Sequence, residues 1–457
     1  MSVTDELASY IVSALHTPLP GPTATKTSHH LLDTIAACAS GAQLGAGKAG
    51  HDFVVSEPAR WPGPAVPILG TASTAGPAGA ALANAMAGHA DETDDSNEFS
   101  RTHPGCSIVP AALSGAVTVG ASAEQLLRAV ALGYDVAARL NIALWPRFQD
   151  LRETKRSTHN TGGMFGSAVA LAALHGLDHE HVKFTLSYVA QQVAGTTTWK
   201  RDVEHIEKSY VFAGWPALGA FHALEYVTFG WPGVRDVFDE EPNFLEIVGV
   251  NPDPQELTRE LGERYEVDRT NIKRFSVGSP AQAPLQGIVD QLRQHQLSST
   301  DVERVVITMP TLLTHTVQGA RQMPDINLPY LAGVATEDGD VSFEAAHDEE
   351  RFQAWQRDGG RAVIEIVPDP DMEPRRQAIV ALHTAQCTVS DHVTKVRGSY
   401  SNPMTTDEVR EKAIGLLAPV VGDRAAAGTA DAALGLVDGG SLDGFLAALA
   451  DVEEVSA

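Results

Sequence analysis

Residues 302–309 (VERVVITM) mark a change of structural class along this chain of 457 residues. Their β-branched side chains predict a strand, and residues 362–367 and 379–389 share this composition. Prolines and glycines separate these segments, and residues 280–295 have the periodicity of a helix. Residues 268–400 are therefore predicted to form an α+β domain.

Working outward toward the N-terminus, the periodicity becomes helical. Ser28 can cap a helix that Gly41 can end, and residues 121–144 repeat its apolar pattern. Residues 163–174 are almost entirely apolar, which is typical of a helix buried on all sides. Helical patterns return at 406–417 and 442–449. We therefore predict a mainly α fold with a large all-helical domain (1–267), the smaller α+β domain (268–400), and C-terminal helices (401–457) that return to the helical domain.

The charge balance limits the classes of partner. The chain has 33 Lys and Arg against 58 Asp and Glu, a formal net charge of −25. Because phosphate binding needs clustered basic side chains, nucleic acid and anionic membranes are not expected as partners. The same charge would repel a small acid at long range, so a pocket for an acid must supply its own cations.

Cysteine usage and the N-terminus predict a cytoplasmic protein. Cys38, Cys106 and Cys387 are far apart in sequence and form no CxxC pair, which favours a reducing compartment over disulfides. The first 15 residues lack the basic and apolar regions of a secretory signal. Residues 61–90 and 104–123 are uncharged for long stretches, but they are rich in small residues and interrupted by prolines. Both are predicted to be buried segments that pack through small residues, not membrane spans.

The densest polar segment is residues 88–105, GHADETDDSNEFSRTHPG, which lies between two apolar stretches. If it continued a helix, His89, Glu92 and Ser96 would lie on one face. Carboxylates buried beside a histidine can tune acids and bases toward neutral pH. A solvated acidic loop with a helix cap is an equally weighted alternative.

Two further segments carry candidate groups in the helical part. His159 precedes glycines that open an apolar helix, where backbone N–H groups favour an anion. The alternative for His159 is a structural histidine. Lys208 lies in a local basic cluster and is a candidate carboxylate clamp, unless it pairs with Glu204 or Glu207 on a helix surface.

The last candidate segment is residues 272–280, IKRFSVGSP, with Lys273 and Arg274 at the predicted domain junction. Domain junctions commonly hold pockets, although a basic hinge is an equal alternative.

Residues 45–50 (GAGKAG) match GxGxxG, but no strand precedes them and no clear helix follows, so they predict a loop and not a dinucleotide site. The histidines in HGLDHEH (175–181) favour a polar link between helices over a metal site. No metal or other cofactor is therefore expected.

Together these segments resemble one protein family. GHADETDDS followed by THPG is similar to the AHxxDFDDT…HPS segment of the MmgE/PrpD family, which includes 2-methylcitrate dehydratase, cis-aconitate decarboxylase and iminodisuccinate epimerase. Further similar segments follow in the family's order over nearly the whole chain: LLDTIAAC (31–38), GYDVAARL (133–140), THNTGGMFGSAVALAAL (158–174), EKSYVFAG (207–214), IKRFSVGSP (272–280), MPDINLPYLAGV (323–334) and SYSNPMTTDEV (399–409).

The resemblance implies a helical domain, an α+β lid domain, a homodimer, and a cofactor-free pocket between the domains. By position it assigns active-site roles to Glu92, Ser96, His103, His159, Lys208 and Lys273, with Tyr330 aligned less clearly. The sequence departs from the family pattern by Glu92 in place of Asp, Ser96 in place of Thr, and Gly278 in place of the histidine of decarboxylase-like members. Losing that imidazole removes a donor or acid from the expected pocket.

The implied function is a cofactor-independent lyase for a small di- or tricarboxylic acid, above all a dehydratase of a 2-methylcitrate-like hydroxy acid. Lys208 and Lys273, supported by Arg274, would stabilise the charge that proton removal builds on a carboxylate. His103 would act as general acid/base with His159 as partner for the hydroxyl, and Glu92, with Asp95 close by, would orient His103. Alternatives are an epimerase or isomerase, a decarboxylase, a metabolite-binding protein without turnover, and, remotely, a metal-dependent hydrolase using His175, His179 and His181.

Overall fold

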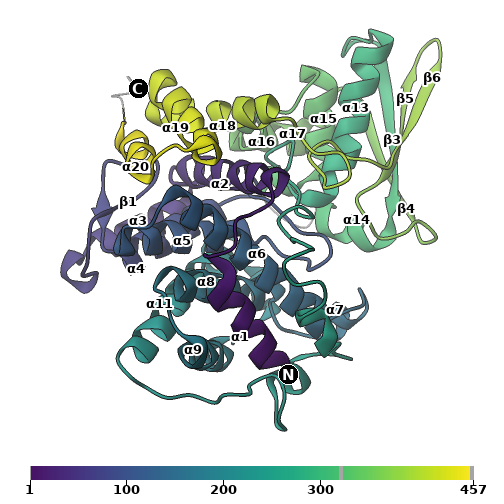
Figure 1. Cartoon of the computed structure of the whole chain (residues 1–457). Helices are drawn as coiled ribbons and strands as arrows, with labels where there is room; N and C mark the ends of the chain where they lie inside the picture. The colour runs from purple at the N-terminus through teal and green to yellow at the C-terminus, as the bar shows by residue number, and fades with distance from the viewer. Residues whose placement is uncertain (1, 319–322, 453–457) are drawn as a thin grey trace. The chain divides into compact units, whose positions relative to one another are not determined.

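The chain divides into two units in the computed structural model, which describes residues 2–318 and 323–452. The chain crosses from one unit to the other after Ala90, Thr93, Thr270 and Met404. Residues 91–93 therefore belong to the second unit, although the segments on both sides of them belong to the first. The first unit is mainly helical, and the second combines helices with a four-stranded sheet (Figure 1). The predicted fold class, mainly α with an α+β second domain, is confirmed.

The first unit is built from helices of very different length. They are α1 (Val3–Ala14), α2 (Gly21–Gly41), α3 (Gly45–Val55), α4 (Pro77–Gly88), α5 (Gly105–Val119), α6 (Ala123–Leu144), α7 (Asp150–Glu153), α8 (Thr158–Leu174), α9 (His179–Gln192), α10 (Ile206–Ser209), α11 (Trp215–Thr228), α12 (Phe244–Val248), α18 (Thr406–Val421), α19 (Asp423–Gly435) and α20 (Leu442–Ala450). A short hairpin pairs β1 (Val66–Pro67) with β2 (Thr74–Ala75). The C-terminal helix α18 packs against α2, so both ends of the sequence contribute to this unit.

The centre of the first unit is formed by α5, α6 and α8, which pack through small residues. A Cβ at Gly133 of α6 would lie 2.5 Å from Ile108 Cγ2 and 2.9 Å from the carbonyl oxygen of Gly166, so only glycine permits this approach. All residues of α8 from Asn160 to Leu174 are buried, as predicted for a helix surrounded on all sides. The predicted burial of residues 104–123 is confirmed for 104–116, whereas Thr118, Val119, Gly120 and Ser122 are exposed.

Two expectations about this unit are wrong. Helix α2 begins at Gly21 and not after Ser28, whose hydroxyl donates to the carbonyl of Thr25 inside the helix instead of capping it. The GAGKAG segment is not a loop but the first half of α3. Gly47 permits close helix packing, because a Cβ there would lie 2.1 Å from the Gly41 oxygen.

The second unit is organised around a sheet of order β4-β3-β5-β6. Strand β3 (Val302–Pro310) is parallel to β4 (Val363–Asp369) and antiparallel to β5 (Ala378–Thr384), which pairs antiparallel with β6 (Thr388–Val393). The helices are α13 (Gln282–His295), α14 (Thr311–Val317), α15 (Leu328–Asp338), α16 (Phe343–Ala346) and α17 (Glu349–Asp358). Helix α13 packs closely on the sheet, where a Cβ at Gly287 would lie 2.7 Å from Val380 Cγ2.

The predicted strand over residues 379–389 is instead a hairpin of two strands. The Thr384 hydroxyl accepts hydrogen bonds from the backbone N–H groups of Gln386 and Cys387 and thereby forms the turn between β5 and β6. Across the described residues, no helix has the length and apolar character that crossing a membrane requires.

Candidate functional site

The polar segment after α4 is a buried loop, so its carboxylates lie beside a histidine as one interpretation expected, but the segment does not continue the helix. Helix α4 ends at Gly88, with His89 as its C-cap residue, so His89, Glu92 and Ser96 do not share a helix face. All residues from His89 to Asn97 are nevertheless buried, Ser96 included, so the loop is not a solvated one. Buried carboxylates need hydrogen-bond partners, and the loop finds them among its own and neighbouring side chains.

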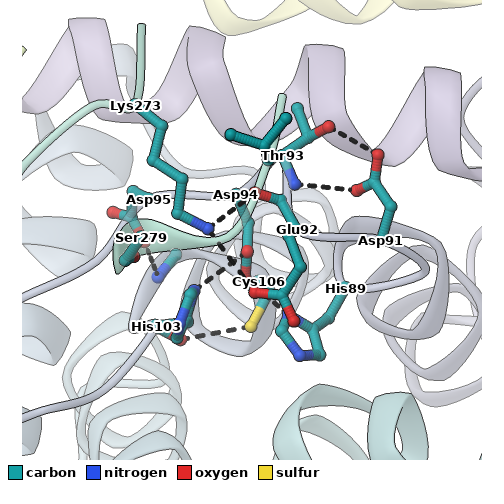
Figure 2. Close-up of polar contacts among 12 residues, drawn as sticks. His89, Asp91, Glu92, Thr93, Asp94, Asp95, His103, Cys106, Lys273 and Ser279 are labelled. Atoms are coloured by element: carbon teal, nitrogen blue, oxygen red, sulfur yellow. Dashed lines mark hydrogen bonds and ion pairs between the residues drawn. The ribbon is translucent and has the colours of Figure 1, made fainter. Parts of the chain in front are cut away.

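Asp94 lies between two histidines of the first unit. Its Oδ2 is 2.9 Å from Nδ1 of His89 and its Oδ1 is 2.9 Å from Nδ1 of His103 (Figure 2). A carboxylate can only accept, so each ring donates from Nδ1. The nitrogen with which His103 can exchange a proton with a ligand is therefore Nε2. The carboxylate that contacts Nδ1 of His103 is that of Asp94, whose role the sequence did not single out.

Asp95 has a structural role instead. Its carboxylate lies 2.9 Å from Nδ1 of His30 and accepts from the Tyr134 hydroxyl at 2.7 Å and the Gly105 amide at 3.0 Å. These bonds tie the loop to α2, to α6 and to the start of α5. The substrate-binding role expected for Asp95 is thus not supported, because its side chain is 0% exposed and engaged with protein donors.

Three histidines of the first unit, His89, His103 and His159, lie around the aromatic ring of Phe212. His159, in the first turn of α8, stacks on Phe212 with ring centroids 3.7 Å apart, and His89 stacks on it at 4.6 Å. The His103 centroid is 5.0 Å from that of His159 and 5.2 Å from that of His89. Phe212 lies in a short π-helical stretch (Tyr210–Gly214), an irregularity that is frequent at functional sites.

His159 is held as a neutral base. Burial, followed by the nearby His103, His89 and Lys208, lowers its pKa well below the usual range. The Thr158 hydroxyl donates its single proton to the carbonyl of Arg101 at 2.9 Å, so its oxygen accepts from Nδ1 of His159 at 3.2 Å. The basic lone pair of His159 therefore lies on Nε2.

Lys208 brings a buried cation to the same cluster. It lies in the single turn of α10, whose following π-helical stretch carries Phe212. Its ammonium nitrogen is 5.2 Å from the ring centroid of Phe212 and 5.6 Å from that of Trp199. Cation–π contacts of this kind position an ammonium group without neutralising it. The first unit thus brings together the sequence candidates His89, His103, His159 and Lys208 with Asp94 and Phe212.

The second unit brings together Glu92 and Lys273. The ammonium group of Lys273 donates to the backbone carbonyl of Glu92 at 2.6 Å and lies 3.9 Å from its Oε2 (Figure 2). Both side chains are at least nine-tenths buried. This unit therefore holds a second buried cation next to a carboxylate.

Two expected substrate-binding residues of the second unit have other roles. Arg274 pairs with Asp290 at 3.2 Å and lies over the ring of Phe275, so its guanidinium serves the packing of this unit. Tyr330 is buried in the core and donates its hydroxyl to the carbonyl of Ala345 at 2.8 Å. Burial raises the pKa of Tyr330 to about 12, and both observations fit a structural residue.

The donor atoms of His89, Asp94 and Cys106 lie within 4.8 Å of one another, a spacing that a metal ion could use. The protonation states of these three side chains favour hydrogen bonds between them over binding of a metal ion. Burial, together with the charges of Asp94 and Asp95, raises the pKa of the Cys106 thiol well above its usual value, whereas a metal ligand must be a thiolate. The histidines at 175, 179 and 181 do not act together either, since His179 contacts the Asp5 carbonyl and His181 pairs with Asp178.

Family models match both parts of the chain. The MmgE/PrpD N-terminal domain matches residues 5–257, and the MmgE/PrpD C-terminal domain matches residues 275–436. The chain belongs to the MmgE/PrpD family. The resemblance inferred from the sequence motifs is therefore confirmed. No curated protein matches the sequence.

The family match includes the buried cluster. In this MmgE/PrpD protein the N-terminal domain match contains Asp94, His103, His159 and Lys208, whereas Lys273 falls between the two matched segments. The MmgE/PrpD family is largely enzymatic and includes dehydratases and decarboxylases. Sequence reasoning did not select Asp94 or Phe212, because Asp94 is one of several acids in its segment and Phe212 carries no polar group.

Proposed function

We propose that this MmgE/PrpD protein is a cofactor-independent lyase that removes water from a small hydroxy di- or tricarboxylic acid, with a 2-methylcitrate-like acid as the first candidate. One observation carries the proposal. A neutral imidazole (His159), an imidazole held by a carboxylate (His103 with Asp94) and a buried cation (Lys208) meet around one aromatic ring. A dehydratase of this class needs a base, an acid and a carboxylate-binding cation.

The first step is removal of a proton from the carbon next to a substrate carboxylate. Nε2 of His159 accepts this proton, and the electron pair of the broken C–H bond moves toward the carboxylate. Lys208 stabilises the negative charge that develops there, which is the kind of interaction that contributes most to many enzymatic rates. The low pKa of His159 keeps it neutral at pH 7, as a base must be.

The second step expels the hydroxyl group. The electron pair returns to form a C=C bond, the C–O bond breaks, and His103 gives a proton from Nε2 to the leaving oxygen, which departs as water. The carboxylate of Asp94 holds His103 in the required tautomer and supports the cationic form that precedes this transfer. The two histidines thus exchange the roles expected from the sequence, because His159 is neutral and His103 is the one that a carboxylate holds.

Glu92 and Lys273 are proposed as further substrate-binding groups, on the strength of the family resemblance and their buried contact. A homodimer and a small carboxylic acid as ligand are also part of the proposal. A second candidate reaction is epimerisation at one carbon. The 5.0 Å spacing of the His103 and His159 rings favours it, because two imidazoles so placed can remove a proton and return one.

Proton NMR in deuterated water tests these reactions against a panel of hydroxy, unsaturated and amino di- and tricarboxylates. We expect one acid to lose water, and we expect His103→Asn to abolish this while an exposed-site control, His295→Asn, retains it. Deuterium uptake at one carbon without water loss would assign the epimerase reaction instead. A folded protein that transforms no acid would contradict the proposal, and tight binding without turnover would assign the metabolite-binding alternative.

A further inference from the structure

His347 of the second unit contacts an oxygen acceptor through each of its ring nitrogens, one in a hydrogen bond and one in an ion pair. It directly follows α16, and its Nδ1 lies 2.7 Å from the carbonyl oxygen of Phe343, on whose ring it stacks at 4.2 Å. Its Nε2 lies 2.9 Å from Oδ2 of Asp91. Nδ1 donates its proton to the carbonyl. The 2.9 Å ion-pair distance from Nε2 to the Asp91 carboxylate fits a ring that also carries a proton on Nε2, which is an imidazolium.

The charges around His347 explain why it is protonated. Burial by itself would lower its pKa, but the hydrogen bond and charge of Asp91, followed by the charge of Asp325, raise the pKa to about 9. Oδ2 of Asp325 lies 3.9 Å from Nε2. The acidic residues Asp348 and Glu349 follow His347 in sequence, and the charge of His347 acts on the Glu349 carboxyl.

The two carboxylates that face His347 also hold the short segment 91–93. The Asp91 carboxylate accepts from the Thr93 amide at 2.9 Å and from the Thr93 hydroxyl at 2.5 Å (Figure 2). Oδ2 of Asp325 accepts from the Glu92 amide at 3.2 Å. Asp91 and Asp325 are each 2% exposed, so without a cation they would be two buried charges of like sign.

We propose that His347 is a positioning residue: its imidazolium pairs with Asp91 and Asp325 and thereby fixes residues 91–93 so that Glu92 stays against the ammonium group of Lys273. The contact that it fixes is the 2.6 Å bond from Lys273 to the Glu92 carbonyl. The inference rests on the proposed function in one respect, because it takes Glu92 and Lys273 as substrate-binding groups.

Hydrogen exchange measured at residue resolution tests the network without any substrate. His347→Gln keeps an amide donor but removes the charge, and His295→Gln, at the exposed end of α13, is the matched control. We expect the amides of Glu92 and Thr93 to exchange at least tenfold faster in His347→Gln and at the native rate in His295→Gln. Unchanged exchange at both amides in a folded His347→Gln protein would overturn the inference.

A second variant covers the case in which His347→Gln does not fold. Asp325→Ala removes the acceptor of the Glu92 amide but leaves the Asp91 carboxylate that accepts from Thr93. We expect faster exchange at Glu92 with a smaller change at Thr93. Equal acceleration at both amides would show general loosening, and the inference would fail.

The pH profile of kcat/KM separates a positioning role from a purely structural one. In the native protein we expect kcat/KM to fall as the pH rises through about 9, where the imidazolium loses its proton. In His347→Gln we expect kcat/KM to be about tenfold lower at pH 7 and to lack this alkaline decrease. An unchanged profile in that variant would overturn the catalytic part of the inference. If the native protein transforms no acid, the proposed function fails, whereas the exchange experiment still decides whether His347 holds the segment.

Discussion

At the scale of single residues, the adjacent acids Asp94 and Asp95 have different roles that their sequence positions do not reveal. Asp94 contacts two imidazoles of the candidate site, whereas Asp95 accepts hydrogen bonds from His30, Tyr134 and the Gly105 amide. The family motif could predict that this segment carries a site. It could not predict which carboxylate bonds His103, because that depends on how the loop turns after Gly88.

The two acids provide a matched pair of variants. Asp94→Asn keeps the side-chain volume but removes the charge that holds His103, so we expect kcat to fall by on the order of 100-fold or more. Asp95→Asn should instead lower the free energy of unfolding by about 2 kcal/mol, because it weakens buried hydrogen bonds to a charged group. Steady-state kinetics and urea titration of both variants check this. Near-native turnover in Asp94→Asn would contradict the role assigned to His103.

At the scale of helices and strands, the sequence predicted those elements whose signal is local. The apolar patterns of α6 and α8 and the β-branched composition of β3 predicted the type of each element correctly. The predictions of element type or boundary were wrong where a contact with another element, or a hydrogen bond from a side chain, determines the local conformation. Gly47 of α3 faces the end of α2, and a Thr384 turn divides one apolar stretch into the strands β5 and β6.

The start of α5 offers a test of such a tertiary constraint. A Cβ at Gly105 would lie 2.5 Å from the Thr34 hydroxyl oxygen, 2.6 Å from the Tyr134 hydroxyl and 3.0 Å from Oδ1 of Asp95. We therefore expect Gly105→Ala to lower the free energy of unfolding by about 1–3 kcal/mol, as overpacking does.

The matched control for Gly105→Ala lies on α19. Gly428 has a helical backbone, and a Cβ there would have open space around it. Gly428→Ala should raise the free energy of unfolding by up to about 1 kcal/mol, because alanine favours a helix. Chemical denaturation measures both changes. A loss of stability in Gly428→Ala, or none in Gly105→Ala, would show that the space around these residues does not decide their effect.

At the scale of the whole molecule, the division into a helical and a mixed unit was predictable because composition and periodicity change over long stretches. The short excursion of residues 91–93 into the second unit was not. It depends on Asp325 and His347, more than 200 residues away in sequence, and no local pattern around residue 91 encodes those partners. The contacts of Asp91 and Glu92 with these distant residues lie within the second unit.

This ion pair makes the stability of the second unit dependent on pH. The pKa of His347 rises from 6.5 to about 9 on folding, so its stabilising effect is fully present below pH 6.5 and is lost as the pH rises through about 9. A shift of this size corresponds to at most about 3 kcal/mol of unfolding free energy. We expect His347→Gln to be less stable than the native protein at pH 6.5, and we expect the difference in unfolding free energy between the two to shrink as the pH rises from 6.5 to 9. Urea titrations at several pH values, with His295→Gln as control, measure the difference. Parallel pH profiles for the native protein and His347→Gln would contradict it, since the pH dependence would then come from groups other than His347.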